Sequence, residues 1–172
     1  EIKQPGWHRR EGHDISAIVV PILQRHGYRT KDDACFLQCF EHGEVKRLRG
    51  ELGWQGRLIQ LMGGGKKGED GTDFDTLRSA AGLAALAKIA DGIGPSIGSV
   101  ISGKTPAERH VTELVKLAHA AGLAVHPYTV RLDELPISVA SADELHRVLF
   151  EEAHVDGVFT DFPDATARFL HK

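Results

Sequence analysis

Short apolar segments recur along this chain, separated by segments in which apolar residues repeat with helical spacing. Residues 34–40 (ACFLQCF) and 57–62 (RLIQLM) are typical of the apolar segments. Their apolar residues do not alternate with polar ones, which indicates strands buried on both faces of a parallel sheet. The intervening segments follow the periodicity of amphipathic helices. The pattern therefore predicts repeated strand–helix units and an α/β fold.

The same pattern assigns bounds to about six strands and the helices that follow them. Strands are predicted over residues 1–3, 34–40, 57–62, 91–95, 123–128 and 155–160. Helices are predicted over residues 14–25, 44–52, 76–90, 105–121 and 141–153, with a last helix beginning at Pro163. Two of them begin with capping-box residues, Thr105 with Glu108 and Ser141 with Glu144.

The number of units leaves two architectures open. A (β/α)₈ barrel requires eight units and usually about 250 residues, whereas this chain has 172 residues. The pattern therefore fits either an open doubly wound sheet or a barrel without its first two units. A composition that is 41% hydrophobic and 26% charged fits one domain over residues 1–172 with a substantial core.

Polar side chains follow the predicted strands, at the end of a parallel sheet where ligands usually bind. Glu1 and Lys3 are two residues apart, so in a strand they point the same way. A carboxylate beside an ammonium suits a hard cation together with an anionic substrate. A solvated surface pair explains the same spacing, and the residues alone do not decide between the two.

Three further strand-end residues have two interpretations each. His126 is either a general base or ligand, or a hydrogen-bonded core histidine. Tyr128 either closes a ligand pocket or packs in the core. Asp161 either binds a ligand or caps the helix that begins at Pro163.

Composition and motifs exclude several classes of protein. A net charge of −3, with His neutral, gives no support for a nucleic-acid or membrane-surface partner. No apolar run approaches the roughly 20 residues that a membrane span requires. The glycine-rich residues 63–75 do not form a P-loop, because Lys67 stands where that motif requires Ser or Thr. We expect a lid or surface loop there, and free thiols at Cys35 and Cys39.

Several segments resemble, in order and spacing, the glycerophosphodiester phosphodiesterase family. They are EIK at residues 1–3, LQCF at 37–40, ADGIGP at 90–95, VHPYTVR at 125–131 and DGVFTDFP at 156–163. The similarity is greatest to the bacterial periplasmic branch and covers nearly the whole chain except residues 63–75. It implies a (β/α)₈ TIM barrel that uses Ca²⁺ or Mg²⁺ to hydrolyse glycerophosphodiesters to glycerol 3-phosphate and an alcohol. It also implies a periplasmic or extracellular location.

The resemblance assigns roles to six residues. Glu1 matches a carboxylate of the metal site. The positions that match phosphate-facing, rim or pocket-lining residues of the substrate site are Lys3, Gln38, Phe40, Tyr128 and Phe162. The expected partner is therefore a small-molecule glycerophosphodiester, with no nucleic acid and no membrane span, and homodimerisation is left open.

The chain also departs from the family pattern. The family carries a His-Arg-Gly motif, a Glu-x-Asp pair and a His-Asp motif before the position that Glu1 matches. None of these precedes Glu1 here, so we expect both catalytic histidines and two metal carboxylates to be missing, and this chain to be an inactive C-terminal portion of the barrel. The alternative is a non-catalytic, barrel-derived binding module. An open-sheet hydrolase lacks support, because no Gly-x-Ser-x-Gly or Gly-x-Gly-x-x-Gly motif occurs.

Overall fold

A four-stranded parallel sheet forms the centre of the computed structural model, which describes residues 1–171. The strand order is β1-β2-β3-β6, so neighbouring strands of the sheet follow one another along the chain. The strands are β1 (Phe36–Cys39), β2 (Arg57–Met62), β3 (Gly92–Pro95) and β6 (Ala124–Val125). Every residue of β3, and every residue of β2 after the first, is buried, which confirms a parallel sheet covered on both faces.

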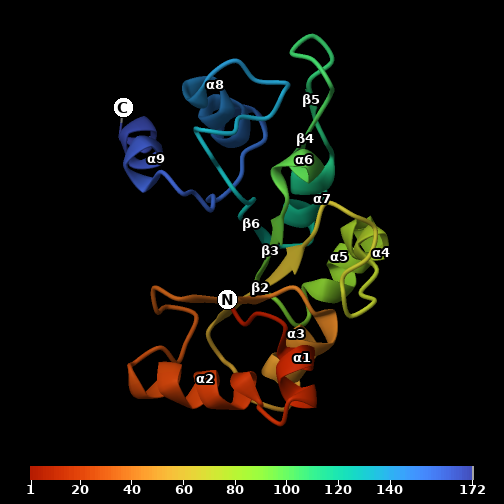
Figure 1. Cartoon of the computed structure of the whole chain (residues 1–172), viewed down its shortest axis with the longest axis vertical. Helices are drawn as coiled ribbons and strands as arrows, with labels where there is room; N and C mark the ends of the chain where they lie inside the picture. Colours follow the sequence, from red (N-terminus) through yellow and green to blue (C-terminus); the bar gives the residue numbers. More distant parts are fainter. Residues whose placement is uncertain (172) are drawn as a thin grey trace.

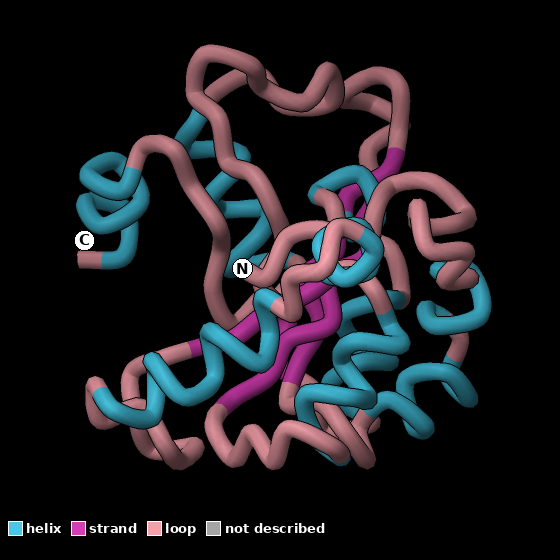
Figure 2. Tube along the Cα trace, turned by 60° about the horizontal axis from the view of Figure 1, so that its bottom comes forward, coloured by secondary structure: helices cyan, strands magenta, loops and turns pink. Residues whose placement is uncertain are grey.

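Helices lie around this sheet, while the strands run through the middle of the molecule (Figures 1 and 2). They are α1 (Pro5–Arg10), α2 (Ile15–Arg25), α3 (His42–Gly50), α4 (Phe74–Arg78), α5 (Ala80–Leu86), α6 (Ile97–Val100), α7 (Leu114–Ala120), α8 (Ala142–Arg147), a π-helical turn (Val148–Glu152) and α9 (Pro163–Leu170). The predicted start of the helix after Ser141 is confirmed, since the Ser141 hydroxyl accepts a hydrogen bond from the Glu144 amide (3.1 Å).

The first and last predicted strands lie beside the sheet without forming regular strands. The Ile2 amide donates to the Gln38 carbonyl (2.9 Å), which places residues 1–3 next to β1. At the other edge, the Phe159 amide donates to the Pro127 carbonyl (2.9 Å), and Val130 and Thr160 form a parallel bridge. This α/β arrangement is compatible with a TIM-barrel-like domain. Within residues 1–171, however, β1 and β6 do not pair with each other to close a barrel.

The helix predicted over residues 105–121 is wrong in its first half. The Thr105 hydroxyl accepts a hydrogen bond from the Glu108 amide (3.3 Å), as a cap does, but only a turn follows. Residues His110–Val111 then form β5, which pairs antiparallel with β4 (Ile101–Ser102). The hairpin stands at one end of the molecule in Figure 1, and helical structure resumes only in α7.

Long-range contacts explain this correction. The Arg109 guanidinium donates to the Glu144 carboxylate (2.5 Å) and to the Ser138 carbonyl (3.1 Å), both near the start of α8. Local start signals are weak compared with such tertiary contacts. The sequence pattern contains the local start signal at Thr105, but it gives no information about the contacts that Arg109 makes with distant residues.

The helix predicted over residues 76–90 is two helices, α4 and α5. Ser79 interrupts it, because its hydroxyl accepts a hydrogen bond from the Gly82 amide (3.0 Å) and so caps α5. The two helices meet closely at Gly82, where a Cβ atom would lie 2.0 Å from the Thr76 carbonyl oxygen. Only glycine therefore fits at this crossing.

Candidate functional site

A cavity of about 400 Å³, here called the first cavity, opens at the carboxyl ends of the strands. Phe40 directly follows β1, Leu61 lies near the end of β2, and Tyr128 follows β6. Its lining residues are Glu1, Lys3, Gln38, Phe40, Leu61, Tyr128, Thr129, Phe159, Thr160 and Asp161. The cavity therefore occupies the position where parallel α/β sheets bind ligands.

Most of the residues predicted from the sequence meet in this cavity. Those brought together are Glu1, Lys3, Gln38, Phe40 and Tyr128. Phe162 is not among the lining residues; it is half-buried and directly precedes α9. Phe159 supplies an aromatic ring from the same segment instead. Side chains alternate between the two sides of an extended segment, so Phe159 and Phe162 are out of phase.

Gln38 lines the first cavity from β1. Its backbone carbonyl accepts a hydrogen bond from the Ile2 amide, and this bond holds residues 1–3 against β1. Its side-chain oxygen Oε1 is buried and has no hydrogen-bond partner among residues 1–171. Buried polar atoms are normally paired, so this oxygen is suited to accept a hydrogen bond from a ligand hydroxyl or a water molecule.

Tyr128 is held firmly at the cavity wall. Its hydroxyl donates to the Met62 carbonyl (3.0 Å), and its ring packs edge-on against the ring of Phe40 at a centroid distance of 5.8 Å. Burial raises the pKa of the Tyr128 phenol. The side chain is therefore a neutral hydroxyl with a fixed orientation.

Phe40 is positioned by Gln60, a strand-end residue to which the sequence assigned no role. Gln60 is fully buried in β2, and its side-chain amide donates to the carbonyls of Phe40 and Leu61 (both 2.9 Å). Its oxygen lies 2.9 Å from Nδ1 of His42. The available signal was an amide within the otherwise apolar segment RLIQLM.

The structure also separates the interpretations of Asp161 and His126. Asp161 lines the first cavity, and α9 has no side-chain cap, so the cap interpretation is wrong. The Asp161 carboxylate lies 3.7 Å from Nε of Arg131. His126 is half-buried outside the cavity lining and packs edge-on against Phe36 at a centroid distance of 4.8 Å.

The carboxylates of Glu1 and Asp161 are the cavity's acidic oxygens, and they do not make a complete metal site. No group of three or more His, Cys, Asp or Glu side chains among residues 1–171 is arranged to hold a metal ion. Both cysteines are free thiols, and burial raises the pKa of Cys39 to about 12. The described residues therefore offer single carboxylate ligands rather than a complete cation site.

The sequence matches the model of the glycerophosphoryl diester phosphodiesterase family over residues 1–165, and the chain belongs to this family. It is 32% identical over 186 residues to a glycerophosphodiester phosphodiesterase of Haemophilus influenzae, covering 99% of this chain and 51% of that protein. It is 31% identical over 189 residues to one of Treponema pallidum, covering 100% and 53% respectively. The chain thus spans about half the length of these curated relatives.

None of the helices within residues 1–171 has both the length and the apolar character required to cross a membrane.

Proposed function

We propose that the protein hydrolyses glycerophosphodiesters to glycerol 3-phosphate and an alcohol. The observation that carries this proposal is the first cavity, which gathers Glu1, Lys3, Gln38, Phe40 and Tyr128 in a chain of this family. An ammonium, a carboxylate, an unpaired amide oxygen and two aromatic rings match the parts of such a substrate. These parts are a phosphate with its cation, a polyol and short carbon chains.

Each residue has a proposed task. The Lys3 ammonium offsets the negative charge of the phosphate oxygens. The Gln38 amide oxygen accepts a hydrogen bond from a glycerol hydroxyl, while Tyr128 and Phe40 pack against the glycerol carbons. Phe162 stays a predicted pocket residue, next to a cavity that Phe159 lines.

Glu1 is proposed as one ligand of a divalent cation, Ca²⁺ or Mg²⁺. Both ions take carboxylate oxygens, and Mg²⁺ commonly binds through one or two carboxylates together with water and substrate phosphate. When bound, the cation would neutralise charge on the phosphate.

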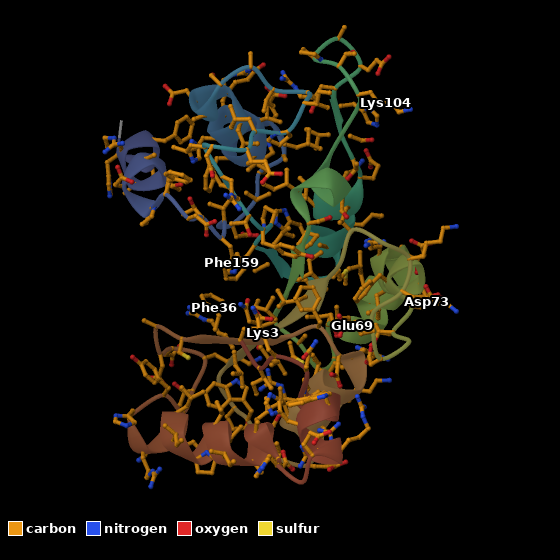
Figure 3. All side chains as sticks on the ribbon, in the orientation of Figure 1. Lys3, Phe36, Glu69, Asp73, Lys104 and Phe159 are labelled. Atoms are coloured by element: carbon orange, nitrogen blue, oxygen red, sulfur yellow. The ribbon has the colours of Figure 1, made fainter. Side chains whose placement is uncertain are left out.

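The proposal is tested by measuring glycerol 3-phosphate release from the full-length protein. Lys3→Ala is expected to lower kcat/KM by about 100-fold, because one stabilising charge at the reacting group is lost. Lys104→Ala is the matched control, since Lys104 is exposed on the hairpin far from Lys3 (Figure 3). Absence of release from every glycerophosphodiester would overturn the proposal in favour of a binding module, as would full activity of the Lys3 variant.

A second variant tests the cation ligand. Glu1→Gln keeps the size of the side chain and removes its charge, so the concentration of Ca²⁺ or Mg²⁺ that gives half-maximal activity is expected to rise about tenfold or more. Activity should be lost with a chelator and return with the preferred ion. An unchanged cation requirement would show that Glu1 is not a ligand.

We further propose that the sheet belongs to a (β/α)₈ barrel, with residues 1–3 and 155–160 as further units beside its four strands. The backbone hydrogen bonds at both sheet edges support this arrangement. A periplasmic or extracellular location is proposed from the resemblance to the periplasmic branch, and cell fractionation tests it.

A further inference from the structure

A second cavity, of about 520 Å³, adjoins the first. Glu1, Lys3 and Phe40 line both cavities, so they form a common wall. The opposite side of the second cavity is built by Gly63, residues 67–70 and Phe74. In the view of Figure 3, Lys3 lies between Phe159 of the first cavity and Glu69 of the second.

The loop that walls the second cavity is held in a defined shape. The Arg78 guanidinium donates to the carbonyls of Gly63 and Gly65. The Phe74 amide donates to the Lys66 carbonyl (2.8 Å), which closes the loop at its base. The Gln4 side chain donates to the Glu69 carboxylate (3.1 Å) and thereby joins the loop to the start of the chain.

A glycerophosphodiester has two arms, one on each side of its phosphorus atom. Lys3, the proposed phosphate ligand, lies where the two cavities meet, so the cavities are placed to take one arm each. The first cavity offers polar groups suited to glycerol, among them the Gln38 amide and the Tyr128 hydroxyl. We propose that the second cavity binds the alcohol arm and selects alcohols that carry a positive charge, an inference that rests on the proposed function.

The lining of the second cavity accounts for this selectivity. Glu1 and Lys3 are shared with the first cavity. The other charged residues that line the second cavity are three acidic ones, Glu41, Glu69 and Asp70, and one basic one, Lys67, so acidic side chains predominate. The aromatic ring of Phe40 lies in the same lining, together with that of Phe74, over which the Arg78 guanidinium lies at 5.8 Å from the ring centroid. Aromatic rings with nearby carboxylates attract ammonium groups, quaternary ones above all, and offer nothing comparable to a neutral or anionic alcohol.

The experiment compares two substrates in the full-length protein, glycerophosphocholine and glycerophosphoglycerol. Both release glycerol 3-phosphate, and they differ in whether the alcohol is charged. The wild-type protein is expected to have the higher kcat/KM for glycerophosphocholine. The double variant Glu69→Gln with Asp70→Asn should lower the ratio of the two kcat/KM values by about 3- to 10-fold, the range expected for two partly screened charges.

These substitutions preserve the loop, because an amide oxygen can still accept the hydrogen bonds that the Gln4 side chain donates to Glu69 and the Thr72 amide donates to Asp70. The matched control is Glu151→Gln, an exposed carboxylate outside both cavities, which should leave both substrates unaffected. An unchanged ratio in the double variant would overturn the inference.

Choline chloride as a probe separates this inference from the proposed function. Titration followed by NMR should show saturable binding to the wild-type protein and weaker binding to the double variant. Release of glycerol 3-phosphate without choline binding would contradict the inference but would still support the proposed function. Choline binding without hydrolysis of either substrate would support a cation-binding cavity and overturn the proposed reaction.

Discussion

His126 lies directly after β6 and is half-buried. Phe36 packs against one edge of the ring, and a side chain at Gly157 would meet its Cδ2 atom at 3.2 Å. Burial lowers the pKa of the His126 imidazole, and the positive charge of Arg57 adds to this effect, while Asp156 opposes it. The folded protein therefore favours the neutral ring.

A pH dependence of stability follows at this residue. Between the lowered pKa of folded His126 and the ordinary value of about 6.5, the unfolded chain binds more protons than the folded one. The free energy of unfolding should thus fall as the pH drops below about 6.5, and His126→Gln should reduce that slope. Urea unfolding at several pH values and an NMR titration of the ring measure both effects. A ring pKa at or above 6.5 would contradict the prediction.

Two Asp-Gly pairs show the same contact at two places in the sheet. The Asp91 carboxylate accepts a hydrogen bond from the Leu58 amide (2.9 Å), and the Asp156 carboxylate accepts one from the Val125 amide (2.8 Å). Both aspartates therefore fasten a new sheet segment to the preceding strand. The segments ADGIGP and DGVFTDFP, which carry the family resemblance, owe part of their character to this structural contact.

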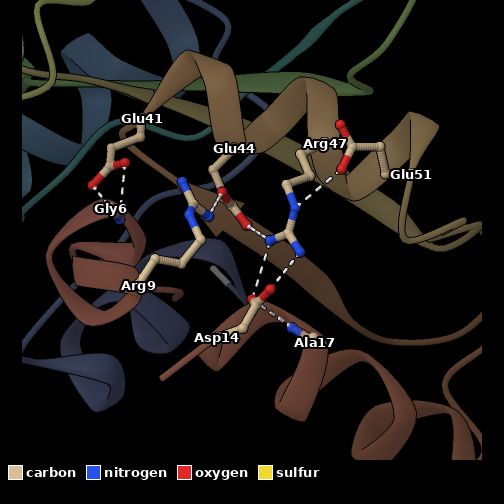
Figure 4. Close-up of polar contacts among 8 residues, drawn as sticks. All are labelled: Gly6, Arg9, Asp14, Ala17, Glu41, Glu44, Arg47 and Glu51. Atoms are coloured by element: carbon tan, nitrogen blue, oxygen red, sulfur yellow. Dashed lines mark hydrogen bonds and ion pairs between the residues drawn. The ribbon is translucent and has the colours of Figure 1, made fainter. Parts of the chain in front are cut away.

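At the scale of elements, a buried carboxylate joins the first three helices. Glu44 of α3 has a fully buried side chain and forms ion pairs with Arg9 of α1 and Arg47 of α3 (Figure 4). Arg47 also donates to Asp14, which caps α2, and this contact holds the pKa of the Asp14 carboxyl below its ordinary value. One cluster thus fixes three helices against each other.

Removing the charge of Glu44 should therefore be costly. Glu44→Gln leaves two guanidinium groups without their buried partner, and we expect the free energy of unfolding to fall by about 3 kcal/mol. Glu51→Gln is the control at the end of the same helix: Glu51 directly follows α3 and also pairs with Arg47, but its side chain is 74% exposed, so about 0.5 kcal/mol or less is expected. Urea unfolding compares the two, and equal losses would contradict this assignment.

At the scale of the whole molecule, the first cavity is assembled from distant parts of the chain. Glu1 and Asp161 lie near opposite ends of the sequence, yet both line it. Parallel strands produce this convergence, because their carboxyl ends all meet at one edge of the sheet. The second cavity adds the loop after β2, which the sequence analysis interpreted only as a lid or surface loop.

The sequence by itself determined the α/β class, the four strands of the sheet and the family. These follow from local signals: apolar segments that form buried strands, and motifs such as DGVFTDFP. It also named six of the cavity residues, Asp161 among them, because strand ends converge in any parallel sheet. It did not reveal that Phe159 lines the cavity or that the buried amide of Gln60 positions Phe40, because these roles depend on which side of a segment faces a neighbour.

Only the tertiary structure decided where a local sequence signal is overridden by contacts with distant residues. The start signal at Thr105 produces one turn and then a hairpin, because Arg109 binds near the start of α8. Asp161 lines a cavity rather than capping α9. The physical reason is the same in both cases. A local capping signal stabilises a helix start by only about a kilocalorie per mole. Contacts between distant segments are large enough to override it, and the spacing of residues along the chain does not show them.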